Sequence, residues 1–366
     1  MNSDFATAMG RALEFTRSGN AHEATRIIAA ALGSGAPTWP TPAAQPQAGA
    51  ARQPLGRVIA SLVNGGVRKA SGMSSFRAGG AQPCVPEGAQ YLERRHQSVF
   101  GSREYRLFVP SPRTEQFRGV VLMLHGCTQS ADDFAAGTRM NEHAERENLM
   151  VAYPQQGRSD NAMGCWNWFQ PGDQKKGAGE PAILAGLARE LAEEYGVTAD
   201  RIFAAGLSAG GAMAAILGAA YPEVFHAVGV HSGLAPGAAS DVASAYAAMH
   251  GQGSGFTGTA PVRTILFHGT ADQTVHPSNA DRVLLSALGS CDSVEFEDRP
   301  AAGRAARRTI HQDVMGNTLA ERWLVEGAGH AWSGGSADGS YTDPAGPDAS
   351  AEIIRFFMQT CEKDDQ

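Results

Sequence analysis

Residues 203–217 read FAAGLSAGGAMAAIL, and one polar side chain, Ser208, stands in this run of small and apolar residues. Its neighbours complete the pattern G-x-S-x-G. This pattern is typical of a sharp turn between a strand and a helix that exposes a nucleophilic serine. The glycines are needed because a Cβ atom there would collide as the helix packs against the strand. We therefore predict a strand over 201–205, a helix over 209–220 and a nucleophile at Ser208.

Apolar strand-like runs alternate with helical runs on both sides of this turn. Continuous apolar strands that alternate with helices predict an α/β fold, with a mostly parallel sheet covered by helices on both faces. The turn at Ser208 falls in the middle of the series, where an α/β hydrolase places its nucleophile. The other predicted strands are residues 105–109, 120–124, 149–153, 227–230, 264–267 and 322–325, and the other predicted helices are 135–148, 180–195 and 349–358.

The first 90 residues have a different composition. Apolar residues recur at helical spacing in residues 1–33, which predicts a short helical segment. It is either a tail that packs on the main domain or a docking element for a partner or an apolar surface. Residues 34–90 are rich in Pro, Ala and Gly, so we expect a flexible linker. The catalytic domain is predicted over residues 91–366.

Composition and charge exclude several classes of function. A net charge of −7, with no dense run of Lys or Arg, argues against binding to nucleic acid. No apolar stretch is long enough for a transmembrane segment, and residues 1–15 do not resemble a secretory signal. An odd and sparse cysteine count favours a reducing compartment, so we expect a cytoplasmic protein, although export would allow one or two bridges. The five cysteines are Cys84, Cys127, Cys165, Cys291 and Cys361.

A serine nucleophile needs a general base and an acid that orients it, and α/β hydrolases carry them in the order Ser, Asp or Glu, His. Asp272, in ILFHGTADQTVHP, comes just after a predicted strand, where parallel sheets present ligand-facing groups. His330, in WLVEGAGHAWSGG, follows the last predicted strand in a glycine-rich turn. We predict that Asp272 is the acid and His330 the base. Asp281, within a helical stretch, is the alternative acid.

Acyl transfer also needs backbone N–H groups that stabilise the developing oxyanion. One is expected from Ala209, the residue after the nucleophile. The second is expected from the loop after an early strand, VVLMLHGCTQSADDF, where the N–H of Cys127 is suitably placed. The side chain of His125 is expected to brace this oxyanion loop.

Several longer motifs resemble the poly(3-hydroxybutyrate) depolymerase family of esterases, with the type 1 catalytic domain. They are LMLHGCTQSADDFAAGTRMNEHAERENLMVAYPQQ, AMGCWNWF, GLSAGGAMAA, VGVHSGL and FHGTADQTVHP. The resemblance covers about residues 91–361 and implies the triad Ser208, Asp272 and His330, with His125 and Cys127 in the oxyanion region. The family also contains feruloyl and acetylxylan esterases, so the resemblance does not fix the substrate. No cofactor or metal site is implied.

The resemblance gives three hypotheses about function. The first is a serine esterase that hydrolyses short-chain polyhydroxyalkanoate or its oligomers. We expect it to act in the cytoplasm, at amorphous storage granules, because the sequence shows no secretory signal and no polymer-binding domain after the closing helix. The second is a feruloyl or acetylxylan esterase, and the third is a non-catalytic granule protein. The aromatic residues Trp166, Trp168 and Trp332 either line an apolar substrate groove or pack in the core.

Overall fold

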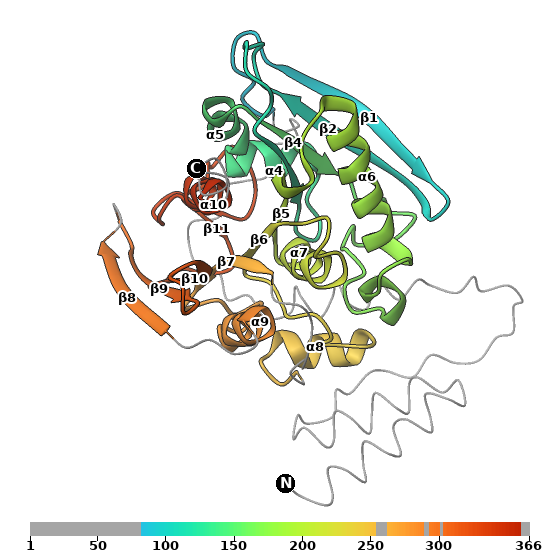
Figure 1. Cartoon of the computed structure of the whole chain (residues 1–366). Coiled ribbons are helices and arrows are strands. Elements are labelled where there is room, and N and C mark those ends of the chain that lie inside the picture. The colour runs from blue at the N-terminus through green and yellow to red at the C-terminus, as the bar shows by residue number, and fades with distance from the viewer. Residues whose placement is uncertain (1–81, 254–261, 289–292, 301–302, 360–366) are drawn as a thin grey trace, which may run out of the picture. The chain divides into compact units, whose positions relative to one another are not determined.

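A ten-stranded sheet forms the centre of the part of the chain that the structure describes (Figure 1). The computed structural model describes residues 82–253, 262–288, 293–300 and 303–359. The predicted helical segment over 1–33 and nearly all of the predicted linker lie outside these residues, so both stay predictions. The first strand begins at Gln90, one residue before the predicted start of the catalytic domain.

The middle of the sheet is parallel, as predicted. The spatial order of the strands is β1-β2-β4-β3-β5-β6-β7-β10-β9-β8. All pairings from β4 to β10 are parallel, whereas the pairings at both edges are antiparallel. The strands are β1 (Gln90–Ser98), β2 (Gly101–Val109), β3 (Gly119–Leu124), β4 (Leu149–Pro154), β5 (Ile202–Leu207), β6 (Ala227–His231), β7 (Arg263–Gly269), β8 (Ser293–Pro300), β9 (Ala305–Gln312) and β10 (Thr318–Val325).

Helices cover both faces of the sheet. Alternate residues of β3 belong to two separate cores, because successive side chains of a strand point to opposite faces. One core contains side chains of α6 (Gly179–Tyr195), α7 (Ala209–Ala220), α8 (Val242–Met249) and α9 (Ser278–Leu288). The other contains side chains of α4 (Ala131–Thr138), α5 (Met140–Glu147) and α10 (Ala349–Met358). The two groups lie on opposite sides of the strands in Figure 1.

The predicted helix over 135–148 is in fact two helices. Arg139, at a left-handed φ of 54°, ends α4, and α5 begins at the next residue. The N-terminal end of α4 is capped by Ser130, whose side chain accepts a hydrogen bond from Asp133 N–H. Both helices keep buried side chains in the same core, which is why one continuous apolar pattern spans the break.

Three smaller features complete the described fold. The 3-10 helices η1 (Pro171–Gln174) and η2 (Ala199–Arg201) flank α6, and the short strands β11 (Trp332–Ser333) and β12 (Thr342–Asp343) pair with each other. Within the described ranges, no helix combines the length and the apolar composition that crossing a bilayer requires.

Candidate active site

Ser208 occupies the turn between β5 and α7, in a strained conformation. Its φ is 58° and its ψ is −118°, which few residues other than glycine adopt. Its N–H donates to the carbonyl of His231, 2.8 Å away at the end of β6. A Cβ atom at Gly210 would lie 2.0 Å from the carbonyl oxygen of Leu124, and one at Gly206 would lie 2.4 Å from the backbone of Gly210. The two glycines are therefore required by the close packing of α7 on β5 and β3, as the motif predicted.

Asp272 and His330 meet at the carboxyl ends of two neighbouring strands. Asp272 follows β7 and His330 follows β10, and these strands are paired in parallel. Nδ1 of His330 lies 2.7 Å from Oδ2 of Asp272. The other carboxylate oxygen accepts hydrogen bonds from the N–H groups of Thr274 and Val275, both at 2.9 Å. The carboxylate is therefore held in one orientation toward the imidazole ring.

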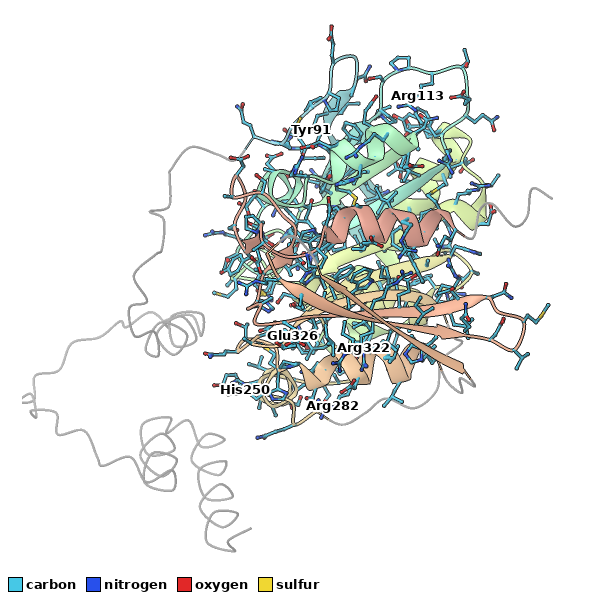
Figure 2. All side chains as sticks on the ribbon, turned by 90° about the vertical axis from the view of Figure 1, so that its left-hand side faces the viewer. Tyr91, Arg113, His250, Arg282, Arg322 and Glu326 are labelled. Atoms are coloured by element: carbon cyan, nitrogen blue, oxygen red, sulfur yellow. A yellow bond between two sulfur atoms is a disulfide. The ribbon has the colours of Figure 1, made fainter. Side chains whose placement is uncertain are left out.

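The surroundings of Asp272 favour its ionised form. Burial raises the pKa of Asp272, but the hydrogen bond and charge of His330 and the N–H of Val275 outweigh it and lower the net pKa. The alternative acid, Asp281, lies on α9 and pairs with Arg322 of β10 rather than with His330. Arg322 lies next to this helix in Figure 2. The geometry thus favours Asp272 over Asp281.

The order of the strands brings Ser208 to the same edge of the sheet as this pair. Between β5 and β7 lies β6, whose last residue, His231, links the two parts of the site. Its carbonyl accepts from Ser208 N–H, and its Nε2 accepts from the N–H of Ser333, three residues after His330. Among the described residues, Ser208 Oγ makes no hydrogen bond to His330. Such contacts are often long in ligand-free enzymes and shorten when substrate binds.

Two buried histidines beside the acid were not predicted as site residues. Burial, with the nearby His268 and His330, lowers the pKa of His231 to about 3, so its ring is neutral. The ring nitrogen Nε2 of His268 donates to the carbonyl of Val275 at 2.8 Å and lies 3.5 Å from Oδ2 of Asp272. Each histidine stands at or near the carboxyl end of a buried strand. That position is the signal that could have identified them.

The two predicted oxyanion donors, Cys127 and Ala209, belong to segments that pass close to each other. A Cβ atom at Gly126, the residue before Cys127, would lie 3.7 Å from Cβ of Ser208. The loop that carries Cys127 therefore runs directly past Ser208. Within the part of the chain that the structure describes, the N–H groups of Cys127 and Ala209 have no acceptor. Two unpaired N–H groups beside a nucleophile are what stabilisation of an oxyanion requires.

His125 braces the oxyanion loop and is fully buried. Its Nδ1 donates to the carbonyl of Gly126 at 2.7 Å, and its Nε2 accepts from the N–H of Gln156 at 3.1 Å. The indole N–H of Trp166 donates to the carbonyl of His125 at 3.0 Å. Burial lowers the pKa of His125 to about 4, so the ring stays neutral. These contacts fit the bracing that the sequence predicted, because both ring nitrogens are bonded to backbone groups of the chain.

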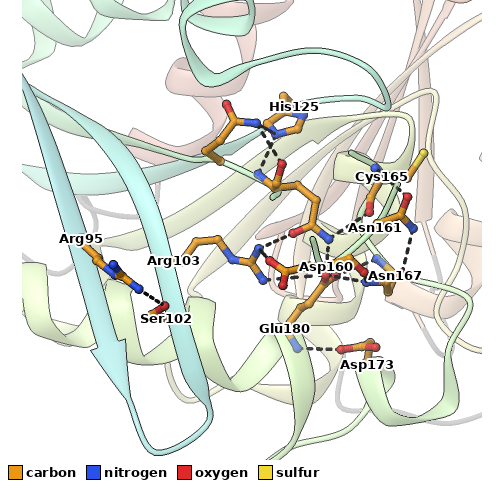
Figure 3. A network of polar contacts seen from close by, with 12 residues as sticks. Arg95, Ser102, Arg103, His125, Asp160, Asn161, Cys165, Asn167, Asp173 and Glu180 are labelled. Atoms are coloured by element: carbon orange, nitrogen blue, oxygen red, sulfur yellow. Dashed lines mark hydrogen bonds and ion pairs between the residues drawn. The ribbon is translucent and has the colours of Figure 1, made fainter. Parts of the chain in front are cut away.

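A buried polar network supports this brace from below (Figure 3). Arg103 donates to the side-chain oxygen of Gln156, and the amide nitrogen of Gln156 donates to Glu180 and to the carbonyl of Cys165. The carboxylate of Glu180 also accepts from the N–H of Asn167 at 2.7 Å. Burial raises the pKa of Glu180 although these hydrogen bonds oppose it. The network joins β2, α6 and the residues just after β4 to the segment around Cys165.

Cys127 and Cys165 form a disulfide, which joins the oxyanion loop to the same segment. This pairing was left open by the sequence, and it opposes the reducing compartment inferred from the odd cysteine count, because disulfides persist mainly in oxidising compartments. Cys84 is exposed and free. Cys291 and Cys361 lie outside the described residues.

The three tryptophans that were candidates either for a substrate groove or for the core lie in the core. Trp166 and Trp332 are 0% and 1% exposed, and Trp168 is 6% exposed. The indole N–H of Trp332 donates to Ser350 at 3.1 Å, and its ring stacks on His231. The prediction of a groove lining is therefore wrong for these residues. Tryptophan has a large apolar surface, which favours the core as strongly as it favours a binding cleft.

Comparison with known proteins places this site in a family. Residues 103–307, more than half of the chain, match the family described as esterase PHB depolymerase. Poly(3-hydroxyalkanoate) depolymerase C of Paucimonas lemoignei is 27% identical over 58% of this chain and 54% of that protein. Feruloyl esterase B of Neurospora crassa is 28% identical over 45% of this chain and 62% of its own length. Acetylxylan esterase A of Talaromyces purpureogenus is 29% identical over 44% of this chain and 47% of its own length. The chain thus spans about half to three fifths of these curated relatives.

The solved structure of an acetyl xylan esterase from Aspergillus awamori has the same fold. It aligns with a TM-score of 0.53 and 20% identity over 66% of this chain and 93% of that chain. Three features agree with that fold: the parallel sheet, the strained turn at Ser208, and the order of Ser208, Asp272 and His330 along the chain. From the match over residues 103–307, this chain belongs to the esterase PHB depolymerase family and has the α/β-hydrolase fold.

Proposed function

We propose that this chain is a serine esterase that works through an acyl-enzyme intermediate. The observation that carries the proposal is the pair of His330 Nδ1 and Asp272 Oδ2, 2.7 Å apart, at the same edge of the sheet as the strained Ser208. Such an arrangement activates a hydroxyl that is otherwise a poor nucleophile. The relatives named as feruloyl and acetylxylan esterases support the same class of reaction.

The reaction follows from the roles of these groups. Nε2 of neutral His330 takes the proton of Ser208 as the hydroxyl oxygen attacks the ester carbonyl, and Asp272 stabilises the imidazolium that forms. The N–H groups of Cys127 and Ala209 donate to the oxyanion of the tetrahedral intermediate. The imidazolium then protonates the leaving alkoxide, and an acyl ester on Ser208 remains. A water molecule, deprotonated by the same histidine, hydrolyses that ester and regenerates the serine.

The proposed substrate is a short-chain polyhydroxyalkanoate or its soluble oligomers. It is supported by the family match and by the depolymerase among the relatives. A feruloyl or acetylxylan esterase is the second candidate, supported by the other relatives. Product analysis with amorphous poly(3-hydroxybutyrate) granules, methyl ferulate and acetylated xylan separates the two. Release of 3-hydroxybutyrate or its oligomers supports the first, and turnover of only the carbohydrate-type esters refutes it.

The catalytic proposal has a direct test. A fluorophosphonate probe should label the wild-type chain, and Ser208→Ala should abolish both labelling and hydrolysis of p-nitrophenyl butyrate. Loss of a triad nucleophile lowers kcat by about 10⁴-fold or more. A Ser208→Ala variant that keeps a tenth of the wild-type rate would show that another residue attacks the ester. The third hypothesis, a non-catalytic granule protein, predicts no labelling of the wild type.

The disulfide bears on where the enzyme acts. A cytoplasmic location at storage granules is the hypothesis from the sequence, whereas the Cys127–Cys165 bond favours an oxidising compartment. Cells that make granules should be lysed into a thiol-alkylating reagent and fractionated. Protein on the granules with both thiols alkylated supports the cytoplasmic hypothesis. Protein outside the cytoplasm with the disulfide intact refutes it.

A further inference from the structure

Tyr341 is an exposed aromatic residue on a strained backbone. It precedes β12, has a φ of 52° and is 46% exposed. A left-handed conformation is uncommon for residues other than glycine and is unfavourable for a bulky one. Its side chain gains little from burial, so packing does not explain why this residue stands here. Backbone strain of this kind gathers at active sites and ligand-binding segments.

The segment around Tyr341 is fixed to the oxyanion loop. Its neighbour Ser340 donates from its N–H to Oδ1 of Asp133 at 2.9 Å and from its hydroxyl to Oδ2 at 2.6 Å. The amide nitrogen of Gln129 donates to the carbonyl of Ser340 at 3.0 Å. The side-chain oxygen of the same glutamine accepts from Gly126 N–H at 2.9 Å. Tyr341 is therefore held in register with the loop that carries Cys127.

The same segment is also fixed to the strand that follows the base. The carbonyl of Tyr341 accepts from the N–H of Trp332 at 2.7 Å, two residues after His330. The parallel pairing of β11 with β12 continues this contact. Tyr341 thus lies between the oxyanion loop and the base-bearing segment, with its side chain exposed.

A second strained residue faces the phenol. Thr128, directly after Cys127, is exposed and has a φ of 68°, which is an outlier for a β-branched side chain. Its Oγ1 lies 3.5 Å from the phenolic oxygen of Tyr341. Its backbone N–H donates to the carbonyl of Met163 at 3.0 Å, which holds the residue in place. Two exposed hydroxyl groups are therefore fixed side by side beside the oxyanion loop.

We propose that Tyr341 and Thr128 form a binding subsite for a second ester group of the substrate. Each hydroxyl can donate one hydrogen bond to a carbonyl oxygen, and the phenol ring offers an apolar face to a short alkyl branch. A hydroxyacyl oligoester presents a carbonyl oxygen and such a branch in every unit, whereas a simple alkyl ester has only the bond that is cleaved. The pair therefore selects oligoesters of hydroxy acids over simple esters. This inference rests on the proposed function.

The test compares two substrates, the linear trimer of 3-hydroxybutyrate and p-nitrophenyl butyrate, in Tyr341→Phe and Thr128→Val. The measured quantity is the ratio of kcat/KM for the trimer to kcat/KM for the simple ester. Removal of one neutral hydrogen bond should lower this ratio by about three- to tenfold. Tyr195→Phe is the matched control, because this half-buried tyrosine at the end of α6 lies near the start of β5, away from the catalytic edge. It should leave the ratio unchanged.

A variant without the ring separates binding from structure. Asparagine tolerates a left-handed backbone, so Tyr341→Asn should keep the loop folded with an unchanged melting temperature while the ratio falls at least as far as in Tyr341→Phe. An unchanged ratio in Tyr341→Phe and Tyr341→Asn overturns the subsite. So does a wild type that cleaves p-nitrophenyl butyrate but not the trimer, although the esterase proposal then stands. A wild type that cleaves neither substrate and takes no fluorophosphonate label overturns the proposed function itself.

Discussion

Removal of the Cys127–Cys165 disulfide should cost both stability and catalytic rate. The bond joins residues 38 positions apart. In the chain-entropy account, closing a loop of this length removes conformational freedom worth about 4 kcal/mol from the unfolded chain. A domain of this size is typically stable by roughly 5 to 15 kcal/mol, so the loss is a large part of the total. The double variant Cys127→Ala/Cys165→Ala should therefore unfold at a much lower urea concentration.

The rate should fall because the bond fixes a proposed oxyanion donor. Without it, the Cys127 backbone is held through its two neighbours, Gly126, which bonds to His125 and Gln129, and Thr128, whose N–H donates to Met163. Loss of one well-placed donor lowers kcat by about 10²-fold, and partial misplacement should cost about tenfold. Urea unfolding and p-nitrophenyl butyrate kinetics should be measured on the double variant, with Cys84→Ser as the matched control. A double variant as stable and as fast as Cys84→Ser would refute this reasoning.

Three further predictions follow from the site. Asp272→Asn should lower kcat by about 10⁴-fold with little change in KM, whereas Asp281→Asn should stay near the wild-type rate; the reverse result in steady-state kinetics would identify the other acid. Gly210→Ala should give no soluble folded protein, because its Cβ would lie 2.0 Å from a carbonyl at the end of β3, and a cooperative melting curve for it would contradict this packing. Burial lowers the pKa of His125 to about 4 and of His231 to about 3, so the unfolded chain binds protons before the folded one as the pH falls below about 6.5. The free energy of unfolding should therefore drop by roughly 2 to 3 kcal/mol per histidine between pH 7 and 4.5. Urea unfolding curves that do not differ between these pH values would exclude neutral buried rings.

The interior of the sheet could be predicted because its strands are buried on both faces. β3, β4, β5 and β6 are fully buried and almost entirely apolar, and a continuous apolar run of this kind can be read from the sequence. The edge strands β1 and β8 were missed, and so was β9, which pairs with β8. In β1 only His96 is buried, and most of the other residues are polar. Such a sequence looks the same in an exposed strand as in a loop. Edge strands are often charged in this way, which makes them hard to tell from loops.

Ser208, Asp272 and His330 could be proposed as a triad from the sequence because of their order along the chain and because each follows a strand of the parallel part of the sheet. The groups that hold them in place could not be found in this way. Glu180, Gln156 and Arg103 come from separate elements, and only the folded chain shows that they meet beneath the oxyanion loop. The burial of Trp166 and Trp332 could not be predicted either, because the type of side chain alone does not distinguish a core position from a cleft position.

His231 shows why the triad and its frame must be considered together. Its backbone carbonyl holds the N–H of Ser208, and its ring nitrogen holds the N–H of Ser333 beside the base. The ring can accept that second hydrogen bond only while it is neutral, which burial secures by lowering its pKa to about 3. A proton on this ring would remove the acceptor and place a positive charge near His330. The residue therefore connects the position of the nucleophile with that of the base, although it has no direct part in the proposed chemistry.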